Sequence, residues 1–234
     1  MRHSVEHRQV FSVRQMRARQ LQLGCAEVQI PASCADNECF HKRFRSIDGT
    51  CNNLEHPIVG AAFAPYIRLL PSVYDDGINS ITGGCLGRRP NPREVSMFLL
   101  STGHSIPGPA NGLLMQFGQF ISHDFTRNAL ENTCTCQSAF DQRCANVPRP
   151  ASDRRNERCL PFTRSFPVCQ TGIGNRSREQ LNENTAYLDG SVIFNGRTFP
   201  PNNGRDSMTV GDDRSTLFVG LAAMHTTFLR LHNK

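Results

Sequence analysis

The chain contains no tryptophan and only three tyrosines among its 234 residues. It also has no run of about 18 apolar residues, so the sequence predicts no membrane-spanning helix. The first 24 residues lack the apolar segment that a secretory signal needs. No CxxC pair recurs at zinc-finger spacing, which disfavours a structural zinc site. The formal charge is +6, but the basic residues are scattered and no aromatic platform accompanies them, which disfavours nucleic acid as a partner.

Cysteine, by contrast, is abundant. Ten cysteines lie in the first three quarters of the chain, among proline, asparagine, glycine and serine. This usage is typical of disulfides formed in an oxidising compartment, and the "NRS" glycosylation sequon at Asn175 agrees with secretion. We therefore expect an extracellular protein. Since a disulfide-rich body without an export signal is unusual, we also expect a longer upstream reading frame.

The chain divides into a polar arm over residues 1–24, expected to be disordered, and a body over residues 25–234. Within the body, residues 85–110 are expected to form a loop. Helical periodicity predicts a helix over residues 111–122, whose apolar face is formed by Leu113, Leu114, Phe117, Phe120 and Ile121. A second helix is predicted at the C-terminal end, with Asp212 or Asp213 as N-cap and an apolar face of Leu217, Leu221, Met224, Phe228 and Leu231.

The stretch "GQFISHDF" places a polar cluster at the end of the first predicted helix. Gln119 and His123 are one turn apart and share a face, whereas Asp124 is rotated by about 100°. A histidine that moves a proton to or from a ligand needs a polar neighbour beside it, and Asp124 is placed to hold a cation elsewhere. The alternative is a core histidine whose hydrogen bonds are satisfied within the protein.

A second oxygen-rich stretch is "TAYLDGS", residues 185–191. In an extended loop, alternate residues point the same way, so Thr185, Asp189 and Ser191 offer side-chain oxygens on one side. The backbone carbonyls of residues 185 and 187 add further oxygens. Together with Asp124, this set suits calcium. A turn stabilised by its own hydrogen bonds explains the spacing equally well.

Arg214 stands just inside the C-terminal helix, in "GDDRS". A buried arginine beside a proton-accepting histidine stabilises a developing anion. The alternative is an arginine that pairs with Asp212 or Asp213.

Several of these stretches, taken together and in order, resemble the animal haem peroxidases, and most of all peroxidasin and the chorion peroxidases. They are "FRSIDGTCNNLEHP", "MQFGQFISHDFT", "CLPFTRSFPVC", "REQLNENTAYLDGSVIF" and "GDDRSTLFVGLAAMHTTFLRLHN", and the resemblance runs from about Cys39 to the C-terminus. It implies a mainly α, loop-rich, disulfide-stapled fold that is the N-terminal part of a peroxidase domain. Part of a domain should leave apolar helix faces exposed.

The resemblance assigns a role to each candidate residue. His123 would be the distal base that takes a proton from hydrogen peroxide, Arg214 would polarise the peroxide, and Gln119 would hold a water or halide, all three beside haem. The calcium ligands would be Asp124, Thr185, Tyr187 through its carbonyl, Asp189 and Ser191.

This sequence departs from the family at four positions. Ser122 and Leu217 replace the carboxylates that commonly form ester links to haem, so any haem bound here is expected to be non-covalent. Val59 and Phe117 stand where the family has tryptophan. The proximal histidine is expected in a later segment, because the histidines on the arginine helix, His225 and His232, match structural positions.

The resemblance and the spacing also suggest disulfide pairs. We expect Cys39–Cys51, Cys134–Cys144 and Cys136–Cys159, and leave Cys25, Cys34, Cys85 and Cys169 unassigned.

Three functions remain open at this point. The first is a peroxidase that uses hydrogen peroxide to oxidise a halide or phenolic donor, such as tyrosines in an extracellular matrix protein. The second is a secreted matrix or binding module on an inactive peroxidase scaffold. The third is a calcium-binding, disulfide-rich adhesion fragment.

Overall fold

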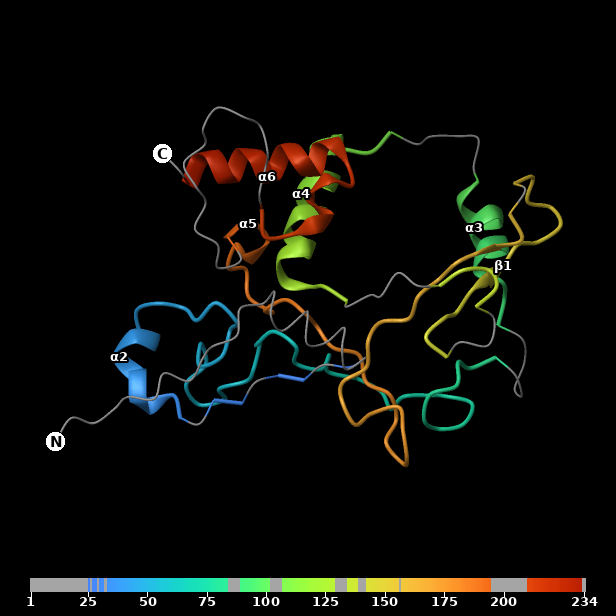
Figure 1. The fold of residues 1–234 in the computed structure, drawn as a ribbon. Helices are drawn as coiled ribbons and strands as arrows, with labels where there is room; N and C mark the ends of the chain where they lie inside the picture. The colour runs from blue at the N-terminus through green and yellow to red at the C-terminus, as the bar shows by residue number, and fades with distance from the viewer. Residues whose placement is uncertain are drawn as a thin grey trace.

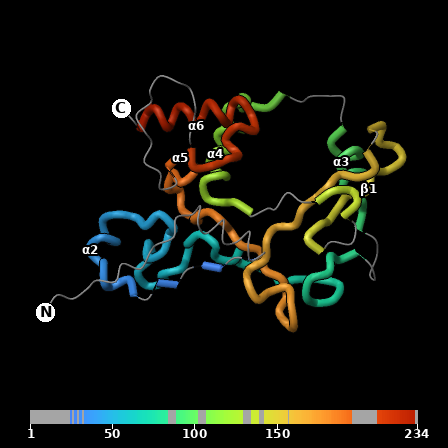
Figure 2. The backbone as a smooth tube through the Cα atoms, viewed as in Figure 1, coloured from blue at the N-terminus to red at the C-terminus, as the bar shows by residue number. Residues whose placement is uncertain are grey.

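The computed structural model describes residues 25, 27–28, 30–31, 33–83, 89–101, 107–128, 134–138, 142–155, 157–194 and 210–232. In these ranges the chain is loop-rich and mostly helical where it is regular (Figures 1 and 2). The elements are η1 (Ala35–Asn37), α2 (Glu38–His41), α3 (Pro92–Leu100), α4 (Gly112–Phe125), β1 (Val147–Pro148), β2 (Cys159–Leu160), α5 (Ser191–Phe194), η2 (Asp213–Thr216) and α6 (Val219–His232). The two strands pair antiparallel. The expected fold class is confirmed, while the polar arm over residues 1–24 lies outside the described residues.

Helix α4 confirms the first predicted helix and extends it. The side chain of Asn111 accepts a hydrogen bond from the amide of Leu113 at 3.1 Å and so caps the N-terminus. The helix ends where the Thr126 amide donates to the carbonyl of Ser122. His123 and Asp124 therefore lie in its last turn.

The second predicted helix is split in the structure. Asp212 is the N-cap of the short helix η2 and accepts a hydrogen bond from the Arg214 amide at 2.9 Å. Helix α6 begins only at Val219. Of the predicted apolar face, Leu221 is fully buried, whereas Leu217 and Leu231 are exposed.

Helix α3 corrects the expectation of a continuous loop over residues 85–110. Asn91 caps this helix by accepting from the amides of Arg93 and Glu94, and Pro92 occupies its first turn. An asparagine followed by proline is a helix-start pattern in the sequence, because proline lacks the amide that a first turn leaves unpaired. That pattern, rather than hydrophobic periodicity, could have revealed the helix.

The core consists of two apolar clusters. One is formed by Ala62, Phe63, Phe166 and Leu181, and the other, which joins α4, α5 and α6, is formed by Phe120, Val192, Ile193 and Leu221. Helices α4 and α6 cross in contact at this second cluster (Figure 1). A Cβ atom on Gly220 would lie 2.6 Å from Cγ of Gln116, so a glycine at this position allows the close approach of the two helices.

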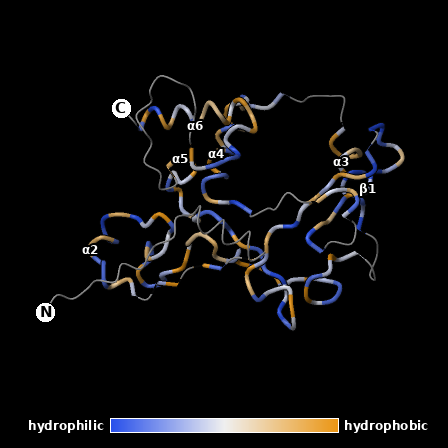
Figure 3. The backbone as a smooth tube through the Cα atoms, viewed as in Figure 1, coloured by the Kyte–Doolittle hydropathy of each residue, from blue (hydrophilic) through white to orange (hydrophobic). Residues whose placement is uncertain are grey.

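The same two helices also expose apolar side chains, as expected for part of a domain. The exposed fraction is 61% for Leu114 and 90% for Val219. Figure 3 shows hydrophobic stretches along both α4 and α6. Helix α6 is therefore not enclosed by the rest of the described chain.

Four disulfides join eight of the nine described cysteines. Cys134–Cys144 and Cys136–Cys159 confirm two expected pairs, and Cys25–Cys169 assigns two cysteines that the sequence left open. Cys85 lies outside the described residues.

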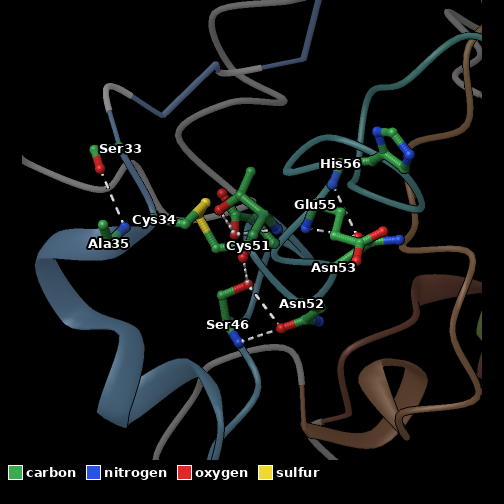
Figure 4. Close-up of a disulfide and its surroundings, with 11 residues drawn as sticks. Ser33, Cys34, Ala35, Ser46, Cys51, Asn52, Asn53, Glu55 and His56 are labelled. Atoms are coloured by element: carbon green, nitrogen blue, oxygen red, sulfur yellow. Dashed lines mark hydrogen bonds between the residues drawn. A yellow bond between two sulfur atoms is a disulfide. The ribbon is translucent and has the colours of Figure 1, made fainter.

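The expected Cys39–Cys51 pair is wrong. Cys51 pairs instead with Cys34, with a Cα–Cα distance of 5.6 Å (Figure 4). Both partners are buried, whereas Cys39 is exposed on α2 as a free cysteine in the described part of the chain. The two loop lengths differ so little that loop-closure entropy separates the pairings by roughly a few tenths of a kcal/mol. Loop length therefore could not identify the partner of Cys51.

Candidate functional site

The C-terminal turn of α4 presents its two functional candidates to different surroundings. Asp124 is buried and turns toward the loop before α5, where it accepts hydrogen bonds from the amides of Gly190 at 3.1 Å and Val192 at 3.3 Å. The His123 side chain is 13% exposed and turns toward η2. The helical rotation between consecutive residues produces this separation, as the sequence predicted.

His123 faces the carboxylate of Asp212. The Nδ1 atom of the ring lies 3.3 Å from Oδ2 of Asp212, whose side chain is only 3% exposed. Nδ1 is buried and has no hydrogen-bond partner in the described chain, so the ring stands slightly off the line of a hydrogen bond to that oxygen.

Burial lowers the pKa of His123 below its ordinary value, and the positive charge of Arg214 lowers it further. The carboxylate of Asp212 opposes these effects without cancelling them. A neutral imidazole keeps one ring nitrogen able to accept a proton, so this environment suits a general base.

The guanidinium of Arg214 contacts the backbone of His123 and not its imidazole ring. It donates to the carbonyl of His123 at 3.1 Å and to the carbonyl of Thr126 at 3.2 Å. It also forms a two-point ion pair with Asp212, with Nη2 2.9 Å from Oδ2 and Nε 2.9 Å from Oδ1. The structure therefore contains the arginine–aspartate pair that the sequence offered as an alternative, and it places this pair next to the candidate base.

Gln119 lies one turn before His123 on α4 and is partly buried. Ser122 is exposed, as is Leu217 between η2 and α6. The resemblance noted in the sequence would place these two residues where ester-forming carboxylates are expected.

The proposed calcium ligands partly converge. The Thr185 hydroxyl donates to Oδ2 of Asp189 at 2.8 Å, and the Ser191 hydroxyl lies 3.4 Å from Oδ1 of Asp124. The phenol of Tyr187 points away and donates to the carbonyl of Val59, which leaves only its backbone carbonyl as a ligand.

The candidate calcium site contains two carboxylates, those of Asp124 and Asp189. Burial raises the pKa of Asp124, and the nearby charge of Asp189 adds to that rise. Arg45 forms an ion pair with Asp189 at 3.2 Å. Within the described residues, no three histidine, cysteine, aspartate or glutamate side chains group as a metal site. The candidate set contains two carboxylates, and its other ligands are hydroxyl and carbonyl oxygens.

Several residues that sequence reasoning missed hold the two candidate regions together. Asn184 donates to the carbonyl of His123 at 2.6 Å. Arg127, just after α4, pairs with Glu183 at 2.6 Å and with Asp212 at 3.3 Å. These contacts join segments far apart in the sequence, so only the opposite charges of the residues hinted at them.

His225 on α6 is a fully buried histidine beneath the site. Its Nδ1 atom lies 3.0 Å from the carbonyl of Leu221, and its ring meets Phe120 edge to face. Nε2 has no hydrogen-bond partner in the described chain. Burial lowers the pKa of His225, so the ring stays neutral near neutral pH.

Comparisons with known proteins agree on one family. The model of the animal haem peroxidase family matches residues 44–198. Peroxidase skpo-1 of Caenorhabditis elegans is 52% identical over 97% of this chain and 38% of its own length. Peroxidasin of Drosophila melanogaster is 30% identical over 90% of this chain and 18% of its own length.

Among solved structures, peroxidase A from Dictyostelium discoideum shares the fold, with a TM-score of 0.60 and 20% sequence identity. The match covers 82% of this chain and 45% of that one. The chain thus spans less than half the length of each of these relatives. No helix within the described ranges is both long and apolar enough to cross a membrane.

Proposed function

The chain belongs to the animal haem peroxidase family, and we propose that it supplies the distal side of a site that reduces hydrogen peroxide and oxidises a halide or phenolic donor. The observation that carries this proposal is the meeting of α4 and η2. There, His123 and Arg214 lie in one partly buried network with the buried Asp212 between them.

The residues present fit the distal side of a haem. Phe117, Leu217 and Phe218 expose apolar surface of the kind that a porphyrin covers. Gln119, His123 and Arg214 would line the group. When bound, haem supplies the iron that peroxide oxidises.

Each residue then has a chemical task. His123 accepts a proton from hydrogen peroxide at Nε2 and later returns it to the leaving oxygen. Arg214 stabilises the negative charge that develops on that oxygen. Gln119 holds a water or the halide donor. Because Ser122 and Leu217 carry no carboxylate, the protein holds haem without an ester link.

We further propose a calcium site formed by Asp124, Thr185, Asp189 and Ser191 with the carbonyl of Tyr187. The buried, neighbouring carboxylates of Asp124 and Asp189 favour a hard cation, because a divalent ion offsets their mutual repulsion. Calcium bound there would hold the last turn of α4 and therefore the orientation of His123.

Secretion is part of the same proposal. Four disulfides support an oxidising compartment. Asn175, the acceptor in the glycosylation sequon, is exposed. An extracellular matrix protein is the proposed source of phenolic donors.

One observation favours a second function, a binding module without catalysis. The guanidinium of Arg214 is engaged by Asp212 and by two backbone carbonyls, and the haem-esterifying carboxylates are replaced. The third possibility, a calcium-binding adhesion fragment, predicts calcium-dependent folding without a haem spectrum.

Titration of the purified 234-residue chain with haem discriminates these functions. The peroxidase proposal predicts a shifted Soret band, and it predicts that acid–organic extraction removes all the haem from the polypeptide. An unchanged spectrum of free haem would contradict haem binding by this chain and favour the binding module or the adhesion fragment. Haem that stays on the chain would refute non-covalent binding alone.

A further inference from the structure

Asp212 occupies the point where the two candidate catalytic side chains meet. We infer that it is a positioning residue for His123, holding the ring proton on Nδ1 and leaving Nε2 as the proton acceptor. The catalytic role of this positioning rests on the proposed function. The inference concerns only the contact between the imidazole of His123 and the carboxylate of Asp212. It can therefore be tested, and refuted, without haem.

The two atoms concerned are close and shielded. Oδ2 of Asp212 lies 3.3 Å from Nδ1 of His123, and Nδ1 has no other hydrogen-bond partner among the described residues. A small rotation of the ring aligns an N–H group at Nδ1 with this oxygen. A buried N–H left unpaired costs free energy, so the ring gains from that alignment.

The carboxylate itself is fixed in place. Oδ1 of Asp212 accepts from the Arg214 amide and Nε, both at 2.9 Å, and from Nη1 of Arg127 at 3.3 Å. Oδ2 accepts from Nε of Arg214 at 3.1 Å, and Nη2 lies 2.9 Å from it. With both oxygens held by guanidinium groups, Asp212 cannot turn away from His123 without breaking an ion pair.

These contacts determine the tautomer of His123. A carboxylate flanked by two guanidinium groups only accepts hydrogen bonds, so the ring nitrogen that faces it must carry the proton. The remaining nitrogen, Nε2, then has the free lone pair. A base oriented by a third group in this way is the usual arrangement in proton-transfer sites.

The substitution Asp212→Asn tests the tautomer with little change in shape. Three donors converge on Oδ1, namely the Arg214 amide, its Nε and Nη1 of Arg127, against two Arg214 nitrogens at Oδ2, so the single amide oxygen of the variant takes the Oδ1 position. The amide NH2 group is then left facing Nδ1 of His123. Since that group donates, it favours the opposite tautomer, with the proton on Nε2.

The matched control is Asp213→Asn. Asp213 also pairs with Arg127, but its side chain is 71% exposed. Asp212, and not Asp213, is the carboxylate paired with the ring of His123. Both substitutions remove one negative charge next to the same arginine.

The readout is the pair of imidazole 15N shifts of His123, measured by NMR at about pH 8, where an ordinary histidine is neutral. Comparison with His123→Gln assigns the signals. We expect a protonated Nδ1 in the wild type and in Asp213→Asn, and a protonated Nε2 in Asp212→Asn. A wild-type ring protonated on Nε2 would overturn the inference even if Asp212→Asn did not fold, and so would an unchanged tautomer in a folded Asp212→Asn.

Discussion

The guanidinium of Arg214 donates to the main-chain carbonyl of His123 at 3.1 Å and so ties η2 to the last turn of α4. Arg214, which we propose as a catalytic residue, therefore also stabilises the backbone of His123. Substitutions at Arg214 should change stability as well as the proposed chemistry.

We predict that Arg214→Ala lowers the free energy of unfolding by about 1–3 kcal/mol, because Asp212 and two backbone carbonyls lose their hydrogen bonds to the guanidinium. Urea denaturation under non-reducing conditions measures this change. Arg154→Ala, on an exposed loop, is the control and should lie within about 0.5 kcal/mol of the wild type. Equal midpoints for the two variants would show that the Arg214 contacts do not stabilise the fold.

The buried histidine His225 predicts a pH dependence of stability. Its pKa is lowered in the folded state, so the unfolded state binds its proton more readily. The folded state should therefore lose stability as the pH falls below about 6.5, the ordinary pKa of histidine. His225→Leu should flatten this dependence, although His123, whose pKa is also lowered, keeps part of it.

Chemical denaturation at a series of pH values measures this effect. His56→Gln, which replaces an exposed histidine, should leave the dependence unchanged. A profile for His225→Leu that coincides with the wild type would mean that His225 takes up its proton equally well in both states.

The proposed calcium site predicts a heat of binding that depends on Asp189. Asp189→Ala removes one of two carboxylates and should abolish the calcium heat measured by calorimetry. It should also loosen the loop over residues 185–191. Asp76→Asn is a suitable control, since Asp76 accepts its hydrogen bonds only within its own turn. Indistinguishable heats for wild type and Asp189→Ala would end the calcium proposal.

The observed disulfide pairing predicts opposite results for two neighbouring cysteines. Cys34→Ser should lower the free energy of unfolding by about 3 kcal/mol, because it opens the Cys34–Cys51 loop. Cys39→Ser should change little, since this cysteine is free and exposed. Non-reducing peptide mapping checks the pairing, and a Cys39–Cys51 peptide from the wild type would restore the pairing expected from the sequence.

Features encoded over one or two helical turns could be predicted from the sequence. The periodicity of α4 and the divergent directions of His123 and Asp124 follow from helical geometry, and the N-cap of η2 could be narrowed to Asp212 or Asp213. The short helix α3 also had a local pattern, the Asn91–Pro92 start, although its apolar residues are mostly exposed and give no clear face.

Features that depend on long-range contacts could not be predicted. The contact between Asp212 and His123 joins two elements, and either Asp212 or Asp213 could have been the partner of Arg214. Cys34 and Cys39 are likewise near-equal choices until the burial of Cys34 beside Cys51 separates them. In each case the sequence supplied the chemical groups, and packing selected among them.

The reaction of the haem-loaded 234-residue chain with hydrogen peroxide tests the central claim most directly. Stopped-flow absorbance in the Soret region gives the rate constant for wild type and for His123→Leu. If His123 is the distal base, the substitution should lower that rate constant by about 10²–10⁴-fold while the chain still binds haem. Equal rate constants for the two chains would contradict the assignment of His123 as the base.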